Sequence, residues 1–311
     1  MALSKIDPAG LDIGQIGGRR NLIINGDFQV SQRGDYTSAT SVTNATYYLD
    51  RWRGSIAGCS ATIQDTGRKQ KMVCTSGGTG TMRTLQIVEP QTINKFLGQK
   101  VTLSAKVTSN SSDCRLLSYM DGWQTESAVH SGGGTEETLS VTFTVPSSPI
   151  SVEASYIIGI DGEQSANVNV NTNDYFEVTE VQLEVGTVAT PFEHISYGEQ
   201  LALCQRYYYK SIFAPISGYN PTTSRADGTV VFPVPMRDAP TALETTGTAS
   251  DYTVYFQSGG VICNSIPTIA SPTTIHGGYV RFNCPVSFVI GQGCLMAPYT
   301  TGAYLAWSAE L

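Results

Sequence analysis

Acidic and histidine side chains are the groups in this sequence that could act as acids, bases or metal ligands. Glycoside cleavage, for example, needs two carboxyl groups held about 5 to 9 Å apart. The carboxylates available for it are Asp121, Glu136, Glu137 and Asp161. Their positions in the sequence do not show that any two of these carboxylates lie close together in space. His130, His194 and His276 stand far apart, and no H-E-x-x-H, G-x-S-x-G or complete phosphate-binding loop accompanies them. We therefore predict no catalytic residue, no metal site and no cofactor, and we do not expect an enzyme.

Aromatic side chains offer a different chemistry, because their ring faces can stack on the C–H faces of sugars. We predict Tyr119, Trp123 and Tyr156 as carbohydrate-contacting residues, since they occur at expected strand ends or in loops. Trp123 belongs to the turn-like stretch Asp-Gly-Trp-Gln. The alternative for all three is that they fill a core, and for Trp52 the core is the expected location.

The basic residues are unevenly placed in a chain whose formal net charge is -7. No Lys or Arg occurs from Leu116 to Gln205, while 13 acidic residues lie between Asp121 and Glu199. Nucleic-acid binding needs clustered cations that displace counterions from phosphates, so nucleic acid is not an expected partner. The acidic run could hold Ca²⁺, but its more ordinary interpretation is a solvated surface.

The N-terminal stretch and the apolar runs bear on export and membrane insertion. The stretch MALSKIDPAGLDIGQIGGRR has no apolar segment of the kind that signal peptides carry. No apolar run approaches the roughly 18 residues that span a bilayer, so we expect neither secretory export nor membrane insertion. Seven cysteines without a C-x-x-C pair predict reduced, buried thiols, with a single bridge such as Cys284–Cys294 left open.

Short segments of alternating polarity, separated by Gly, Ser and Asn turns, dominate residues 21–193. The expected strands are Leu22–Val30, Tyr47–Arg53, Ala61–Asp65, Gln70–Thr75, Arg83–Val88, Lys100–Thr108, Arg115–Met120, Glu137–Val145, Val152–Ile160 and Tyr175–Glu184. In the last of these the alternation slips once near Glu180, which indicates a β-bulge. Strands at this spacing predict an all-β protein whose first domain is a two-sheet sandwich.

One helix is expected, over residues 196–210, within a connecting segment that spans 194–210. Ser196 and Glu199 have the spacing of a capping box. The apolar stripe of the helix is narrow and consists of Leu201, Cys204 and Tyr208. The helix could pack across a sandwich, or it could connect domains and pack against symmetry mates in an oligomer.

Residues 211–311 form a second strand-rich region that has very few charged side chains. The expected strands are Thr229–Val234, Thr253–Phe256, Val261–Asn264, Gly278–Asn283 and Ala303–Ala309. A charge-poor surface is typical of the centre of a protein interface. We therefore predict that this domain oligomerises or forms a distal tip, and that the protein is a homo-oligomer.

Residues 1–20 form an N-terminal arm whose apolar residues are too sparse to build a core. Its apolar positions alternate and are Ile6, Leu11, Ile13 and Ile16. Such a segment becomes ordered only against a partner, so we predict that these residues dock onto another protein.

Three strings resemble a class of bacteriophage virion appendage proteins, the tail or head fibres and receptor-binding proteins. They are GLDIGQIGGRRNLIINGDFQVSQRG at 10–34, YLDRW at 48–52 and VQLEVGTVATPFEHISYGEQLALCQRYY at 181–208. VFPVPMRDAPT at 231–241 and the terminal YLAWSAEL are similar to the same class. Arg33-Gly34-Asp35 also matches the tripeptide of animal adhesion ligands, but a match of three residues is short enough to arise by chance.

The resemblance implies a jelly-roll sandwich, similar to the carbohydrate-binding modules of bacterial glycanases, for residues 21–193. In those modules an N-G-x-F-E opening and an Asp-rich last strand often hold a structural Ca²⁺. Here Gln29 stands in place of the Glu, and Thr179 with Glu180 stands in place of the paired Asp. A neutral amide is a weaker Ca²⁺ ligand than a carboxylate, so the resemblance does not carry the metal site over to Asp27 and its neighbours.

The same resemblance implies a location and a set of partners. The arm would dock on other virion proteins of the tail or capsid, the sandwich would bind a host surface glycan, and the C-terminal domain would trimerise. Synthesis in the host cytoplasm fits both the missing signal peptide and the unpaired cysteines. Two alternatives stay open: a depolymerase that cleaves the polysaccharide, and a connector or capsid decoration that binds no ligand.

Overall fold

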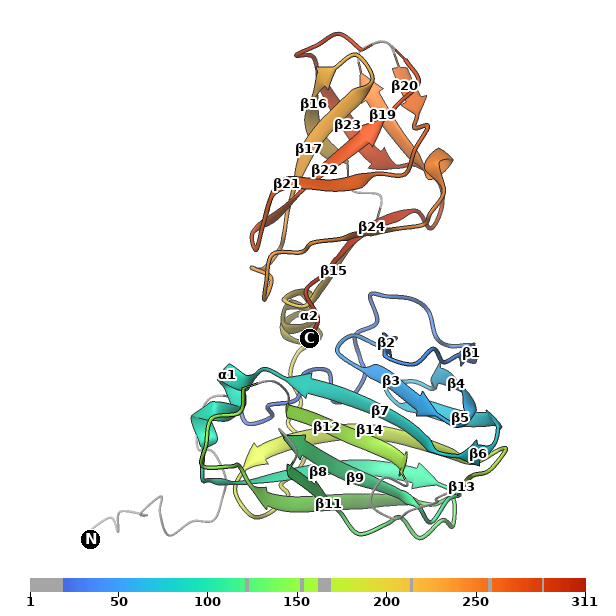
Figure 1. Ribbon diagram of the computed structural model, residues 1–311, viewed down its shortest axis with the longest axis vertical. Helices are drawn as coiled ribbons and strands as arrows, with labels where there is room; N and C mark the ends of the chain where they lie inside the picture. The colour runs from blue at the N-terminus through green and yellow to red at the C-terminus, as the bar shows by residue number, and fades with distance from the viewer. Residues whose placement is uncertain are drawn as a thin grey trace, which may run out of the picture. The chain divides into compact units, whose positions relative to one another are not determined.

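The computed structural model describes residues 19–120, 123–151, 154–161, 169–212, 215–256, 259–286 and 288–311. The chain divides into two compact units (Figure 1): unit 1 comprises Met1–Gln200 with Leu311, and unit 2 comprises Leu201–Glu310. The division falls inside a helix. The described part of the chain does not include the expected docking residues Ile6, Leu11, Ile13 and Ile16. The roles expected for the arm (1–20), the sandwich (21–193), the connecting segment (194–210) and the C-terminal domain (211–311) stay predictions.

Unit 1 is a jelly-roll β-sandwich of two six-stranded antiparallel sheets. In spatial order the first sheet contains β1 (Thr40–Ser41), β4 (Ser60–Asp65), β5 (Gln70–Ser76), β14 (Tyr175–Val185), β8 (Lys100–Ser109) and β11 (Glu136–Thr144). The second contains β10 (Trp123–Glu126), β9 (Cys114–Met120), β12 (Ala154–Asp161), β7 (Thr81–Val88), β3 (Arg53–Ala57) and β2 (Thr46–Tyr47). The all-β jelly-roll predicted from the sequence is therefore confirmed.

Three smaller elements complete the described part of unit 1. They are the β6–β13 ribbon (Gly78–Thr79 with Asn169–Val170), the short helix α1 (Pro90–Ile93) and the 3₁₀ turn η2 (Asn94–Phe96).

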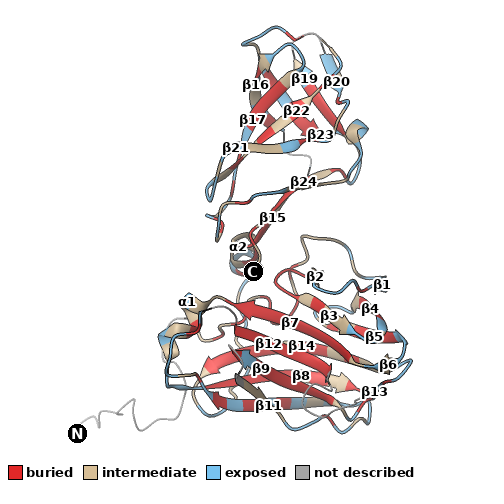
Figure 2. Cartoon of the chain, in the orientation of Figure 1, coloured by how far each residue is buried: buried red, intermediate tan, exposed pale blue. Residues whose placement is uncertain are grey.

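The core of unit 1 lies between the two sheets. Successive side chains of a strand point to opposite faces of its sheet, so every second side chain points into this core. Figure 2 shows continuous buried stretches along the central strands of both sheets. Trp52 is fully buried, as predicted, and its Nε1 donates to the Asn25 carbonyl at 2.8 Å. The Phe28 ring packs on Trp52 with centroids 4.9 Å apart, so the opening segment is part of this core.

The prediction of a strand over Leu22–Val30 is wrong, because this segment contains bends and turns instead. Asn25 and Phe28 have left-handed backbones, with φ of 58° and 54°, and such residues interrupt an extended strand. The Asn25 carboxamide holds the bend: its Nδ2 donates to the carbonyls of Val30 and Asp50, and its Oδ1 accepts from the Val30 amide.

The bent segment nevertheless pairs with the first sheet. The Leu22 amide donates to the Leu183 carbonyl at 2.9 Å, and the Val181 amide donates to the Gly26 carbonyl at 2.8 Å. Strand β5 pairs with β14 only as far as Val178. The segment therefore takes the place beside β14 that β5 leaves open.

Strand β14 contains the predicted bulge. Its pairing with β8 shifts between Thr179 and Gln182, and Glu180 has φ of 51°. The expected strand over Tyr47–Arg53, by contrast, is interrupted by a turn between β2 and β3. Left-handed Arg51, with φ of 70°, lies in that turn.

Unit 2 contains a three-stranded and a seven-stranded antiparallel sheet. The smaller consists of β15 (Tyr208–Ile212), β24 (Tyr304–Ser308) and β18 (Leu243–Thr245). The larger consists of β20 (Gly259–Ile262), β19 (Tyr252–Phe256), β23 (Gly293–Pro298), β16 (Ile216–Thr222), β17 (Arg225–Val231), β22 (Gly277–Asn283) and β21 (Thr268–Thr274). The 3₁₀ turn η3 (Ala249–Asp251) precedes β19. Three aromatic rings contact one another in the core of unit 2, and they belong to Tyr209, Phe232 and Trp307.

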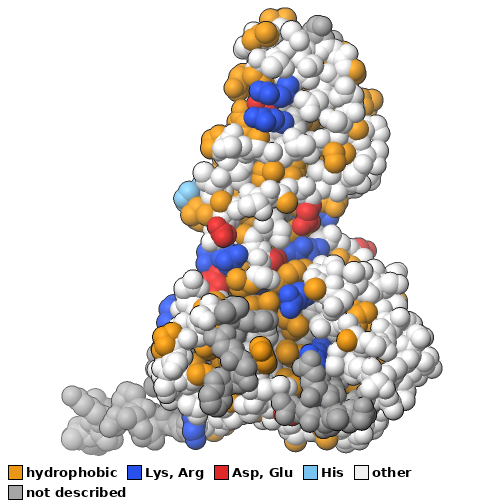
Figure 3. Space-filling view, viewed as in Figure 1, with side chains coloured by type: hydrophobic (Ala, Val, Ile, Leu, Met, Phe, Trp, Pro, Cys, Tyr) orange, Lys and Arg blue, Asp and Glu red, His pale blue; other side chains and the backbone are white. Residues whose placement is uncertain are grey.

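The upper part of unit 2 is mostly uncharged on the face that Figure 3 shows, apart from a small group of basic side chains around an acidic one. Asp227, only 2% exposed, lies 3.1 Å from Arg225 Nε and 3.7 Å from Arg281 Nε. The Tyr279 hydroxyl donates to the same carboxylate at 3.1 Å. The pair of arginines compensates this buried charge. Oligomerisation of this domain stays a prediction.

The helix α2 spans Tyr197–Gln205, which is shorter than the expected 196–210. Ser196 caps it, because its hydroxyl accepts from the Glu199 amide at 3.3 Å. It ends early because Tyr208 enters β15 and pairs with Ser308 of β24. Among the described residues, none of the helices combines the length and apolar character that crossing a membrane requires.

All seven cysteines are free thiols. The bridge left open between Cys284 and Cys294 does not form. Cys284 instead contacts Cys263, with the two Sγ atoms 3.6 Å apart.

Candidate functional site

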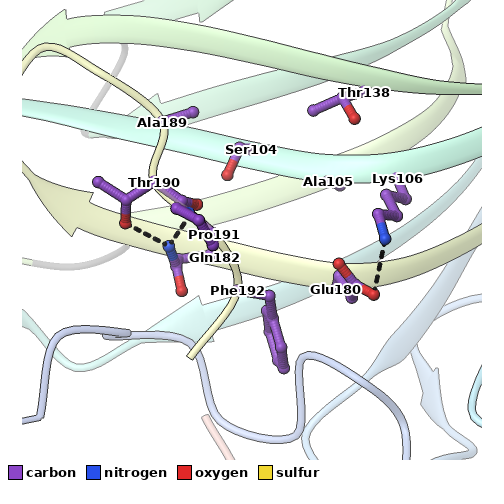
Figure 4. Close-up of a pocket in the computed structure, with 10 residues that line it drawn as sticks. All are labelled: Ser104, Ala105, Lys106, Thr138, Glu180, Gln182, Ala189, Thr190, Pro191 and Phe192. Atoms are coloured by element: carbon purple, nitrogen blue, oxygen red, sulfur yellow. Dashed lines mark hydrogen bonds and ion pairs between the residues drawn. The ribbon is translucent and has the colours of Figure 1, made fainter. Parts of the chain in front are cut away.

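Two adjoining cavities lie on the outer face of the first sheet of unit 1. The larger, about 280 Å³, lies over β8, β11 and β14 and is bordered by residues 189–192. The smaller, about 220 Å³, adjoins the turn at residues 67–69. Both are lined by Lys106 and Glu180, so the two cavities adjoin, and we call them together the sheet groove. Figure 4 shows the larger cavity and the side chains around it.

Strand alternation supplies the floor of the sheet groove. Leu103 and Val107 face the core, which directs Ser104 and Lys106 of β8 to the outer face. On the neighbouring β14 the bulge shifts the register, so that Thr179 pairs with Lys106 and Gln182 pairs with Ser104. The bulge therefore brings polar side chains of both strands onto one surface.

Ion pairs fix the charged side chains of the groove. Lys106 Nζ lies 2.9 Å from Glu180 Oε1, and Lys69 Nζ lies 3.1 Å from Glu136 and 3.3 Å from Glu177. Hydrogen bonds to Glu180 and to Glu136 raise the pKa of Lys106 and of Lys69, respectively. Both lysines are therefore ammonium ions at neutral pH, held in position by carboxylates.

The segment 187–194, which we call the strap, runs beside β14 and forms one wall. It is held by Glu184, whose fully buried carboxylate accepts from the Thr190 amide at 2.8 Å and from the Thr190 hydroxyl at 2.6 Å. Gln182 Oε1 accepts from the Glu193 amide at 2.9 Å. A wall bonded in this way is preformed, because its backbone groups are already satisfied within the protein.

The strap also carries two rings. Phe192 lines the larger cavity and His194 the smaller, and the rings meet edge to face with centroids 5.0 Å apart. Phe192 is half-buried, so part of its surface stays open to a ligand in the groove.

The residues that the resemblance connects with Ca²⁺ do come together, around Arg68. Arg68 Nη1 lies 3.7 Å from Asp27 Oδ2, and its Nη2 donates to Gln29 Oε1 at 3.2 Å. Thr179 Oγ1 donates to the Arg68 carbonyl at 2.7 Å, and Glu180 is paired with Lys106. These donors do not fit Ca²⁺, because a guanidinium already lies among them and the remaining carboxylate is engaged.

The three predicted sugar-contacting aromatic residues lie on neighbouring strands of the second sheet, but Tyr119 and Tyr156 differ in exposure. Tyr119 of β9 is 37% exposed, in keeping with a surface role that stays a prediction. Trp123 begins β10 and pairs with Met120, but its side chain lies outside the described residues. Tyr156 is wrong as a contact residue: it is fully buried and stacks on Phe143 at 6.2 Å, because β12 directs it into the core.

Tyr119 and Tyr156 do not line the sheet groove. Of the residues that do, Asp27, Thr179 and Glu180 are named from the sequence only in connection with calcium, and the sequence did not single out the others as a sugar site. Lys106, Glu180 and Gln182 sit on strands that were predicted correctly. Their polar alternation and the bulge near Glu180 were visible in the sequence. The strap was not foreseen, because only the tertiary structure places residues 187–194 beside β14.

The four carboxylates considered for catalysis are either bonded to other side chains or lie outside the described residues. Glu136 binds Lys69, and Glu137 accepts from Ser131 and lies 3.7 Å from His130 Nε2. The hydroxyl of Ser131 lowers the pKa of Glu137. Asp121 and the side chain of Asp161 lie outside the described residues. Within the described residues, no three or more His, Cys, Asp or Glu side chains gather in a group that could hold a metal ion.

No protein-family model matches the sequence, and no curated protein matches it. Several solved structures are similar in fold. A family 4 carbohydrate-binding module is 15% identical, covers 52% of this chain and 97% of its own, and has a TM-score of 0.28.

Two further structures show the same degree of likeness. A family 29 carbohydrate-binding module complexed with mannohexaose is 15% identical, covers 48% of this chain and 92% of its own, and has a TM-score of 0.26. The tripod from the baseplate of bacteriophage Tuc2009 is 15% identical, covers 58% of this chain and 60% of its own, and has a TM-score of 0.31. At such identities and TM-scores the likeness does not extend to function.

Proposed function

We propose that this protein is a non-enzymatic bacteriophage virion appendage that binds host cell-surface polysaccharide, and that the sheet groove is its glycan site. The observation that carries the glycan proposal is the groove itself: a preformed depression with fixed hydrogen-bonding side chains and an aromatic wall. Sites of this kind suit sugars, which offer hydroxyl groups around the ring edge and C–H groups on the ring face.

The chemistry of the groove matches both parts of a sugar. The Lys106–Glu180 pair presents a donor and an acceptor side by side, each held by the other. Ser104 and Thr138 add hydroxyls along the floor. Phe192 offers a ring at the edge of the same cavity (Figure 4). Because these groups are positioned before binding, little entropy is lost in ordering them.

The charge of the groove favours a neutral glycan. The basic side chains that line it are Arg68, Lys69 and Lys106, and the acidic ones are Asp27, Glu136 and Glu180. Three positive charges oppose three negative ones, so the lining has no net charge when His194 is neutral. A strongly anionic polysaccharide would gain no electrostatic attraction here.

The virion part of the proposal rests on the sequence strings at 10–34, 48–52 and 181–208. In this role the arm attaches the protein to other virion proteins, and unit 2 assembles three copies. The protein is made in the host cytoplasm and acts in the virion. The charge-poor surface expected for unit 2 supports assembly through that part of the chain.

Glycan binding is tested with the purified full-length protein on an array of capsular and lipopolysaccharide glycans. We expect Lys106→Ala to weaken binding about tenfold or more, since it removes a charged hydrogen-bond donor. Lys95→Ala is the matched control, because exposed Lys95 of η2 does not line the groove. Equal binding by wild type and Lys106→Ala would reject the groove as the site.

Two further measurements separate the alternatives. Release of reducing ends from a bound polysaccharide would favour a depolymerase over a binding protein. Gold labelling of this protein on intact particles tests virion assembly, and a particle without label would reject it. A labelled particle whose adsorption is unaffected by groove substitutions would favour a structural connector.

A further inference from the structure

The turn that joins β4 to β5 has an unusual sequence for its shape. The Thr66 amide donates to the Lys69 carbonyl at 3.0 Å, and the two central residues, Gly67 and Arg68, have φ of 88° and 62°. Such a turn favours Gly, Asn or Asp at its centre, because a bulky side chain is strained at positive φ. Arginine at this position indicates that its side chain has a role that outweighs the strain.

The guanidinium of Arg68 joins parts of the chain that are remote in sequence. It lies 3.7 Å from the Asp27 carboxylate and donates to Gln29 Oε1 at 3.2 Å, both in the bent opening segment. The carbonyl of the same residue accepts from Thr179 Oγ1 at the β14 bulge. Arg68 therefore contacts the opening segment with its side chain and the last strand of unit 1 with its backbone.

Asp27 needs a cation at this place. Its side chain is 8% exposed, and its Oδ1 accepts no hydrogen bond from the residues that the structure describes. A carboxylate withdrawn from water this far is costly unless a positive charge lies nearby. The nearby lysines, Lys69 and Lys106, are each bound to other carboxylates.

We infer that Arg68 is a built-in cation that replaces the divalent ion at this position, so that unit 1 holds its opening segment without calcium. The guanidinium lies between the donors that a metal would use, Asp27 and Gln29. Calcium takes 6 to 8 oxygen ligands, and the groove's other acids are paired with lysines. The inference does not depend on glycan binding, because it concerns how the fold is held together.

The first experiment measures thermal unfolding of the full-length protein with CaCl₂ and with EDTA. We expect the same Tm in both for wild type. Arg68→Asn keeps a residue that tolerates positive φ and removes the charge, so we expect a Tm several degrees lower, with Arg68→Lys in between. Lys95→Asn serves as a control for lost surface charge. A wild-type Tm that falls in EDTA, or an Arg68→Asn Tm equal to wild type, would overturn the inference.

The second experiment restores a metal site. The double variant Arg68→Asn with Gln29→Glu places a second carboxylate beside Asp27 and removes the guanidinium. We expect CaCl₂ to raise the Tm of this variant and calorimetry to detect Ca²⁺ binding that wild type lacks. A double variant that is folded by circular dichroism but unresponsive to Ca²⁺ would show that Arg68 does not occupy a cation position.

Discussion

Gly26 and Val181 lie too close for a side chain to fit between them: a Cβ on Gly26 would stand 2.1 Å from the Val181 carbonyl oxygen. The Val181 amide also donates to the Gly26 carbonyl at 2.8 Å. This contact seats the opening segment against β14. We expect Gly26→Ala to lower the free energy of unfolding by about 2 to 4 kcal/mol, measured by urea denaturation, because the backbones must separate.

Gly198→Ala is the control for this substitution. Gly198 lies in the first turn of α2, and a Cβ there meets nothing within 4 Å. Alanine is the better helix former, so this variant should be unchanged or more stable by up to about 1 kcal/mol. A Gly26→Ala variant as stable as wild type would mean that the opening segment does not pack tightly on β14.

Truncation of Tyr156 should destabilise the protein much more than truncation of Tyr119. Tyr156→Ala removes a fully buried ring from the core, and we expect it to cost about 3 to 5 kcal/mol of unfolding free energy. Tyr119→Ala removes a ring that is 37% exposed, and we expect a change of less than about 1 kcal/mol. Denaturant unfolding of both variants measures these free energies. A large loss of stability with Tyr119→Ala would contradict the placement of Tyr119 at the surface.

Asp251 should make the stability of unit 2 dependent on pH. The hydroxyls of Thr246 and Thr300 donate to its carboxylate at 2.6 and 2.7 Å and lower its pKa. A lowered pKa stabilises the folded state above the ordinary value of 3.8, and this contribution is lost as the pH falls through the folded-state pKa. We expect Asp251→Asn to lower Tm at pH 7 but to converge with wild type at lower pH. A Tm difference that is constant from pH 7 to pH 2.5 would contradict this assignment.

Cys263 and Cys284 should form a disulfide when the protein is mildly oxidised. Their Sγ atoms lie 3.6 Å apart in the core of unit 2. Exchange with oxidised glutathione would yield one intramolecular disulfide and two reduced glutathione molecules. We expect peptide mass mapping to find this pair cross-linked, and stability to rise by about 3 kcal/mol. Cys294→Ser should leave the cross-link intact, whereas a pair that stays reduced, or that cross-links elsewhere, would contradict the prediction.

The sequence was sufficient for features that depend on local pattern. Alternating polarity located β8, β9 and β14 to within a residue or so, because each strand buries one face in the core. The single slip near Glu180 located the bulge for the same reason. Capping chemistry likewise located the start of α2 at Ser196.

Other features of the same chain lack a local signal. The stretch 22–30 has the composition of a strand, yet it bends because the carboxamide of Asn25 bonds to Val30 and to Asp50, far away in sequence. Tyr156 has the residue type of a sugar-binding ring, but only the pairing of β12 with its neighbours directs it inward.

By itself, then, the sequence determined the all-β class, most strands of the sandwich, the bulge and the short helix, since each follows from period and capping within a few residues. Only the tertiary structure decided the site. The sheet groove combines β8, the bulged β14, the turn at 67–69 and the strap, and these meet through hydrogen bonds and ion pairs between distant segments. The same long-range packing brings Arg68 to Asp27, at the position that the resemblance connects with calcium.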